Sequence, residues 1–213
     1  MALLRSISGE TPIDDLSDLK VKGIRTLREL NQLEAQNILK ATEKYFLGRL
    51  TTRKAPFDYS WVLRLHGEMF GEVWAWAGTL RTHPTNIGVI QSQIEQLLAD
   101  LLLRLPYWKN EPWFMQAAML HHEAVRIHPF TNGNGRWSRM LANVWLRRHG
   151  QPHTLWPEET VGARSEVRKA YLSAVKAADE GEYGLLAALH RRFTPEKKIR
   201  DARKKKNGRD SSQ

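Results

Sequence analysis

The segment 128–140, HPFTNGNGRWSRM, concentrates side chains that could bind and process a phosphorylated ligand. Gly133 and Gly135 allow the backbone to turn tightly and to approach a ligand closely. The amides around them are expected to open a helix, where unpaired N–H groups can bind an anion. Arg136 and Arg139 lie on one face of that first turn. Positive charge at a helix N-terminus is electrostatically unfavourable, because it opposes the helix dipole, unless a bound anion offsets it. The pattern therefore predicts a polyphosphate site.

His128, which stands just before this basic loop, is the candidate for chemistry. An imidazole titrates near neutrality and can accept a proton from an attacking hydroxyl. Asn132 and Asn134 supply amide groups that can orient phosphates or a cation. Together these residues predict a site that reacts with a polyphosphate as well as binding it.

Other interpretations of this region fit less well. The zinc protease signature HExxH fails because His122 and Glu123 are followed at the required position by Arg126. The phosphate loop GxxxxGK[ST] is absent from the sequence. The chain has no cysteine, which excludes disulfides, thiolate nucleophiles, zinc ribbons and iron–sulfur clusters. An ordinary helix–turn–helix connection, with glycine only as turn former, stays as the plain structural alternative.

The same segment resembles the signature of Fic-domain proteins, HPFx[D/E]GNGRxxR. The likeness extends to VWAWAGTLRTHPTNIG (73–88), HHEAVRIHPF (121–130) and YLSAVKAADEGEYGLL (171–186), and covers about residues 57–190. With LRELNQLEAQNI near the N-terminus, the pattern is most similar to the bacterial subgroup called mobile mystery protein B, whose genes accompany a helix-turn-helix partner, mobile mystery protein A. The signature is matched at His128, Pro129, Phe130, Gly133, Asn134, Gly135, Arg136 and Arg139.

The resemblance implies a protein adenylyltransferase, which transfers AMP from ATP to a Ser, Thr or Tyr hydroxyl of a target protein and releases pyrophosphate. His128 would be the general base. The backbone of Gly133, Asn134 and Gly135 would hold the α- and β-phosphates together with Arg136, and Arg139 would hold the γ-phosphate. Phe130 would anchor the loop in the core.

Asn132 departs from the family pattern, which has Asp or Glu there to coordinate Mg²⁺. An amide oxygen can ligate Mg²⁺ but brings no negative charge, so metal affinity should fall. The triphosphate could still carry the ion, or the enzyme could use another nucleotide, transfer another phosphate-containing group, or remove AMP. A catalytically silent module that binds nucleic acid or a protein partner is the alternative from a different class.

Residues 78–90, GTLRTHPTNIGVI, break the helical pattern with glycines, a proline and β-branched residues, and predict a short β-hairpin. The resemblance makes this a flap that clamps the target segment by adding a strand. The residues expected to contact the target are Arg81, Thr82, His83, Asn86, Ile87 and Gly88.

Glu34, on the expected N-terminal helix, is a candidate inhibitory residue. Many Fic proteins are inhibited by a helix bearing [S/T]xxxE[G/N], whose glutamate pairs with the second arginine of the signature. Here position 30 is Leu and position 35 is Ala, so the motif is not met. A solvent-facing helix glutamate is the plain alternative.

The elements that position these residues are mostly helices with a 3.6-residue apolar period, so the fold is predicted to be mainly α, a Fic-fold helical bundle with the hairpin flap over the loop. The N-caps expected for the second and third helices are Asp58 or Ser60, and Ser92. The expected helices cover about 26–47, 58–70, 92–105, 110–128, 135–149, 158–178 and 183–193. The histidines outside the loop are expected to be core or surface residues, and Trp137 to pack in the core.

The 213 residues divide into an N-terminal helical segment, 1–56, a Fic core domain, 57–194, and a basic, disordered tail, 195–213. The tail holds eight basic and three acidic residues, half of the formal net charge of +10, and suits solvation or weak nucleic-acid contact. No secretory signal and no apolar window of ~18 residues is present, so we expect a cytoplasmic protein that does not enter a membrane.

Overall fold

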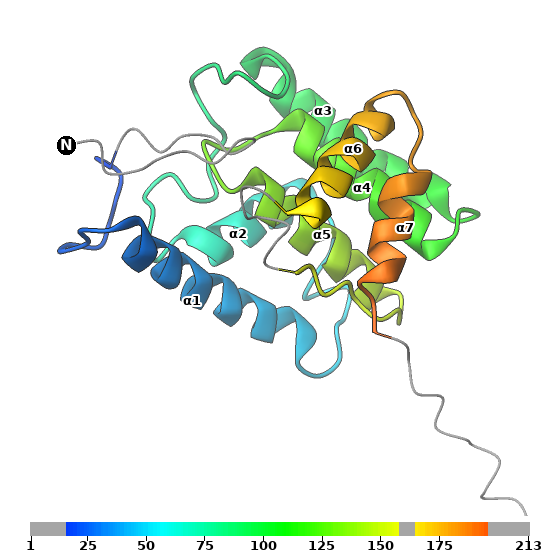
Figure 1. The fold of residues 1–213 in the computed structure, drawn as a ribbon, viewed down its shortest axis with the longest axis horizontal. Coiled ribbons are helices and arrows are strands. Elements are labelled where there is room, and N and C mark those ends of the chain that lie inside the picture. The colour runs from blue at the N-terminus through cyan, green and yellow to red at the C-terminus, as the bar shows by residue number, and fades with distance from the viewer. Residues whose placement is uncertain (1–15, 158–164, 196–213) are drawn as a thin grey trace, which may run out of the picture.

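The computed structural model describes residues 16–157 and 165–195, and this part of the chain is mainly helical, as predicted. Figure 1 shows α1 along one side and α7 on another, with α2, α4 and α5 between them. No described helix is long and apolar enough to cross a membrane. The helices are α1 (Leu27–Phe46), α2 (Tyr59–Phe70), α3 (Gln91–Arg104), the 3-10 helix η1 (Leu105–Trp108), α4 (Trp113–Ile127), α5 (Asn134–Arg148), α6 (Glu166–Asp179) and α7 (Gly184–Arg192).

Side chains cap three of the described helices, at Thr26, Asp58 and Ser165. Thr26 and Glu29 form a reciprocal capping box at the start of α1. Asp58 accepts the Trp61 N–H at the start of α2, which confirms one of the two predicted caps. Ser92 is not a cap, because α3 already begins at Gln91, after Ile90 and without a side-chain cap bond.

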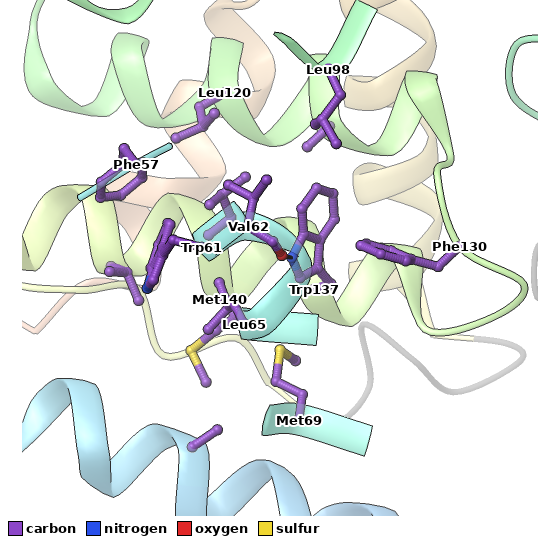
Figure 2. Close-up of a cluster of buried hydrophobic side chains, with 14 of the residues drawn as sticks. Phe57, Trp61, Val62, Leu65, Met69, Leu98, Leu120, Phe130, Trp137 and Met140 are labelled. Carbon is purple, nitrogen blue, oxygen red and sulfur yellow. Dashed lines mark hydrogen bonds between the residues drawn. The ribbon is translucent and has the colours of Figure 1, made fainter. Parts of the chain in front are cut away.

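The main core gathers around α2, whose apolar residues face α3, α4 and α5 (Figure 2). Trp61, Val62 and Leu65 are fully buried there, and burial stabilises each by about 1.5–3 kcal/mol. Trp137 of α5 is buried against them and donates from Nε1 to the Val62 carbonyl at 3.1 Å, so its predicted packing role is confirmed. Helix α1 contributes Leu30 to the same core, so it packs directly on the helices that support the loop.

Helices α6 and α7 form a second layer on α4. Its small apolar cluster includes Ala118 from α4, Tyr171 from α6 and Leu186 from α7. The layer matters for the site because Tyr171 lies against Arg139 of α5, with the guanidinium carbon 5.6 Å from the ring centroid.

The predicted hairpin at 78–90 is not confirmed, because no strand is formed in residues 16–157 and 165–195. The backbone at its two ends bonds to the loop after α4 instead: Arg81 N–H donates to the Pro129 carbonyl at 2.9 Å, and Val89 N–H to the Ile127 carbonyl at 3.5 Å. A strand partner is thus replaced by the loop itself. We call residues 80–89 the flap segment.

Candidate active site

The loop begins at His128, which ends α4 in the left-handed conformation (φ 53°, ψ 57°). This conformation costs a residue other than glycine on the order of 1 kcal/mol. The His128 N–H donates to the Ala124 carbonyl at 3.3 Å, and the residue is 5% exposed. The surrounding structure therefore holds the histidine in a specific, strained orientation.

Electrostatics make the His128 imidazole a neutral base. Burial lowers its pKa to about 4; a hydrogen bond to the Val125 carbonyl acts in the opposite direction, and the charge of Arg81 lowers the pKa further. A ring that donates to this carbonyl presents its other nitrogen as an acceptor. At neutral pH the ring can thus take a proton.

Gly133 caps α5 and is required by space. Its φ is 78°, and a Cβ there would lie 2.7 Å from the Phe70 ring. Gly135 differs, since a Cβ there would meet only the Arg139 guanidinium, at 3.9 Å. The open side of the first turn of α5 is therefore at Gly135, beside an arginine and the N–H groups that a helix N-terminus leaves unpaired.

Asn134 holds the loop together from inside. Its side chain accepts the Phe130 N–H at 2.9 Å and donates to the Phe130 carbonyl at 2.8 Å, and it is buried. Both ends of the Asn134 amide group are engaged within the loop, and its expected contact with phosphate stays a prediction. Phe130 is fully buried, as predicted.

Asn132 turns its amide oxygen onto its own loop, where it accepts the Gly133 N–H at 2.5 Å. No group of three or more acidic or histidine side chains in residues 16–157 and 165–195 could hold a metal ion. Asn132 therefore offers Mg²⁺ a neutral amide oxygen that is already bonded within the loop, and no carboxylate charge.

His66 of α2 packs against the loop and bonds to it. The sequence did not predict this role. Its ring stacks on Phe130, with centroids 3.6 Å apart and planes 11° apart. Nδ1 accepts the Gly78 N–H, and Nε2 lies 3.0 Å from the Asn132 carbonyl, so Nε2 carries the proton. Burial lowers the pKa of His66 to about 3. The available signal was its position on the apolar face of α2.

Arg136 is paired with Glu34 of α1, across 102 residues of sequence. Glu34 is 2% exposed and also accepts from Trp74 Nε1 at 2.6 Å. The alternative of a solvent-facing glutamate is therefore wrong. The partner is the first arginine of the signature, however, and not the second as the resemblance implied.

Arg139 lies three residues after Arg136 on α5, against the ring of Tyr171. Burial lowers its pKa, and the charges of Arg136 and Arg168 act in the same direction, while Tyr171 opposes them. No carboxylate of the described residues forms an ion pair with Arg139, whereas Arg136 has Glu34. The start of α5 thus carries more positive than negative charge, which suits a polyanion.

The flap segment lies against His128. Gly88, at φ 94°, approaches so closely that a Cβ there would be 2.4 Å from the His128 Cβ. Arg81 points inward and is 4% exposed. The other predicted target contacts are exposed, namely Thr82, His83, Asn86, Ile87 and Gly88.

Comparison with known proteins relates this chain to one family. Residues 56–146 match the model of the Fic/DOC family and form a domain of that family. Protein adenylyltransferase Fic of Drosophila virilis is 32% identical over 128 residues, which are 57% of this chain and 25% of that protein. The chain spans about a quarter of the length of the curated relatives it matches.

Solved structures share the fold. Fic-1 (residues 134–508) from Caenorhabditis elegans aligns with a TM-score of 0.62 and 25% identity, over 81% of this chain and 50% of that one. BepC, a VirB-translocated effector from Bartonella tribocorum solved with bound AMPPNP, aligns with a TM-score of 0.61 and 20% identity, over 85% of this chain and 94% of that one.

Proposed function

We propose, from the premise that residues 56–146 form a Fic/DOC family domain, that this protein transfers AMP from ATP to a hydroxyl side chain of a target protein. The observation that carries the proposal is a neutral, buried His128 next to a helix N-terminus that is open at Gly135 and bordered by two arginines. The relatives named protein adenylyltransferase support the same reaction.

In this reaction the target hydroxyl oxygen attacks the α-phosphorus of ATP. The new O–P bond forms, the bond from the α-phosphorus to the bridging oxygen breaks, and pyrophosphate leaves with that electron pair. His128 takes the hydroxyl proton on its accepting nitrogen. Its fixed backbone orientation would align the base with the attacking oxygen, which is the main requirement in phosphoryl chemistry.

The phosphates would lie at the start of α5. The resemblance implies that the backbone of Gly133, Asn134 and Gly135 and the Arg136 side chain hold the α- and β-phosphates. The Gly133 N–H is bonded to Asn132, whereas the N–H groups of Asn134 and Gly135 stand at the start of α5, where intrahelical partners are lacking, and would bind phosphate oxygens. Arg139 would reach the γ-phosphate. These hydrogen bonds would neutralise charge that develops on the leaving pyrophosphate.

The resemblance implies a magnesium ion with Asn132 as its ligand. The described residues around Asn132 offer such an ion few ligands. The Asn132 oxygen is bonded to Gly133 N–H, and no carboxylate stands in its place. We therefore derive no step through a metal. Asn132 also keeps open the alternatives of another nucleotide, another phosphate-containing group or removal of AMP.

Glu34 is proposed as a regulatory residue that acts on Arg136. Its carboxylate occupies the guanidinium that a phosphate would use, so the ion pair and the nucleotide would compete. The contact joins the N-terminal segment 1–56 to the core domain 57–194, a division that stays a prediction.

The finer features of the resemblance remain proposals. These are the mobile mystery protein B subgroup, a bacterial cytoplasmic location, a helix-turn-helix protein as partner and a role as the toxin of a toxin–antitoxin pair. Weak nucleic-acid contact through the tail 195–213 would appear as DNA affinity that falls steeply with salt. Apart from Pro195, that tail lies outside the described residues.

The experiment that tests the proposal incubates the purified protein and a cell lysate with ATP, UTP or GTP labelled at the α-phosphate. Compared with lysate alone, addition of the purified protein should increase label from α-labelled ATP on protein, and should not increase label from γ-labelled ATP. Intact-mass analysis then identifies the added group. Absence of any α-label from all three nucleotides, or transfer that continues in His128→Ala, would overturn the assignment.

A further inference from the structure

Arg81 was expected to contact a target, but its side chain is directed into the protein. Its Nε donates to the His128 carbonyl at 2.7 Å, and its backbone N–H donates to the next carbonyl, of Pro129, at 2.9 Å. One residue of the flap segment therefore donates hydrogen bonds to two consecutive carbonyls of the loop that begins at His128.

The remaining guanidinium nitrogens of Arg81 donate hydrogen bonds within the flap segment. One donates to the His83 carbonyl at 3.1 Å and the other to the Val89 carbonyl. These acceptors stand near the two ends of the exposed stretch, so a single planar group fixes both ends. The acceptors named here are all neutral carbonyl oxygens, and burial lowers the pKa of Arg81.

The bond to His128 acts on the orientation of its imidazole. The direction of a carbonyl depends on ψ of its residue, and the direction of an N–H on φ. The His128 N–H is bonded to Ala124 and its carbonyl to Arg81, so both sides of this left-handed residue are fixed. The direction of its Cα–Cβ bond is then fixed as well.

The bond to Val89 acts on the distance between flap and base. Gly88 is the neighbour of Val89, and it lies so near His128 that a Cβ would be 2.4 Å from the His128 Cβ. A target segment lying along the flap would therefore have its position set by the same guanidinium that orients the base.

We propose that Arg81 is a positioning residue of the transfer reaction, which couples the flap segment to His128 so that a target hydroxyl held by the flap meets the imidazole in line with the α-phosphorus. The proposal rests on the proposed function. Arg81 does not reach the phosphate-binding turn through any of its bonds, so its effect should fall on the rate of transfer and spare the binding of ATP.

The test compares Arg81→Lys with Arg147→Lys. Arg147 also donates to two backbone carbonyls, those of Phe46 and Gly48, but at the far end of α5. A lysine keeps the charge and loses the planar fork at both positions. The readouts are the rate of self-labelling by α-labelled ATP as a function of ATP concentration, the binding of a fluorescent ATP analogue, and thermal unfolding.

Arg81→Lys should lower the maximal labelling rate about 100-fold, the scale expected for a small misplacement of reacting groups, with the half-saturating ATP concentration unchanged. Arg147→Lys should label like the wild type. Labelling by folded Arg81→Lys at the control rate, or a change confined to ATP affinity, would overturn the proposal.

A second variant covers the case in which Arg81→Lys does not fold. Gly88→Ala is at an exposed position and would push the flap segment away from His128, so it should show the same loss of rate at unchanged ATP affinity. Wild-type labelling by this folded variant would then overturn the proposal. An inactive wild type would instead contradict the proposed function.

Discussion

The catalytic loop and the flap segment meet at His128 but are built in different ways. The loop, residues 128–135, is largely buried and tied by its own side chains, as the reciprocal bonds of Asn134 with Phe130 show. The flap segment is mostly exposed and is held near its ends by Arg81. The difference indicates that the loop proposed to bind phosphate is fixed by its own buried contacts, whereas the segment proposed to bind the target is held at few points.

Removal of the base is the strongest way to test the loop. His128→Ala should reduce transfer by about 10³-fold, since a positioned general base contributes about 10²–10⁴. ATP binding should persist, because the groups proposed to bind its phosphates are on α5 and not on His128. Labelling assays and titration with a fluorescent ATP analogue measure the two effects. Equal loss of both would show that the loop had collapsed.

The two loop glycines should separate folding from binding. Gly133→Ala forces a side chain into positive φ and against Phe70, and should cost about 2–4 kcal/mol of unfolding free energy in a urea titration. Gly135→Ala meets no such contact and should leave stability unchanged while weakening ATP binding about tenfold, or about 1.4 kcal/mol. Equal destabilisation by both would remove the distinction between packed and open glycine.

Glu34 should limit access to the loop from the α1 side. Glu34→Gly is expected to raise labelling about tenfold, equivalent to about 1.4 kcal/mol, because the Arg136 guanidinium is then free to bind phosphate. The unfolding free energy should fall, because Arg136 and Trp74 each lose a partner. Glu72→Gly is the control, since Glu72 forms an exposed ion pair with Lys40. No gain over this control would retire the inhibitory role.

Acid should destabilise the protein through its buried histidines. The folded pKa is about 4 for His128 and about 3 for His66 and His190, against about 6.5 when unfolded. The unfolded chain therefore takes up protons first, so stability is complete above pH 6.5 and falls towards pH 4, by about 1.4 kcal/mol per pH unit for each group. Urea titrations across this range measure the slope.

The pH dependence of labelling should follow the pKa of His128 in the folded protein. Labelling by the folded protein should stay level from pH 8 to pH 5 and decline only as His128 is protonated, near pH 4. His190→Gln should reduce the slope of stability with pH and leave the pH profile of activity unchanged. A decline of activity already near pH 6.5 would show that the loop leaves His128 open to water.

The sequence predicted the parts of this fold that depend on neighbouring residues. The helices and the Asp58 cap follow from local spacing, whereas the chemistry expected of the 128–140 segment stays a prediction. Contacts across long stretches of chain could not be read in this way: Glu34 and Arg136 are 102 residues apart, and His66 reaches the loop from α2. The predicted hairpin is not confirmed for the same reason: the backbone N–H groups of Arg81 and Val89 bond to the carbonyls of Pro129 and Ile127 and not to each other's strand.

The reciprocal bonds between Asn134 and Phe130 also bear on the energy needed for catalysis. They satisfy the inner polar groups of the turn without solvent, so charge developing on a leaving group would meet dipoles that already point the right way. In water the same dipoles would have to be turned during each reaction. In the proposed reaction, an amide side chain inside the loop would therefore lower the reorganisation energy without contacting the substrate.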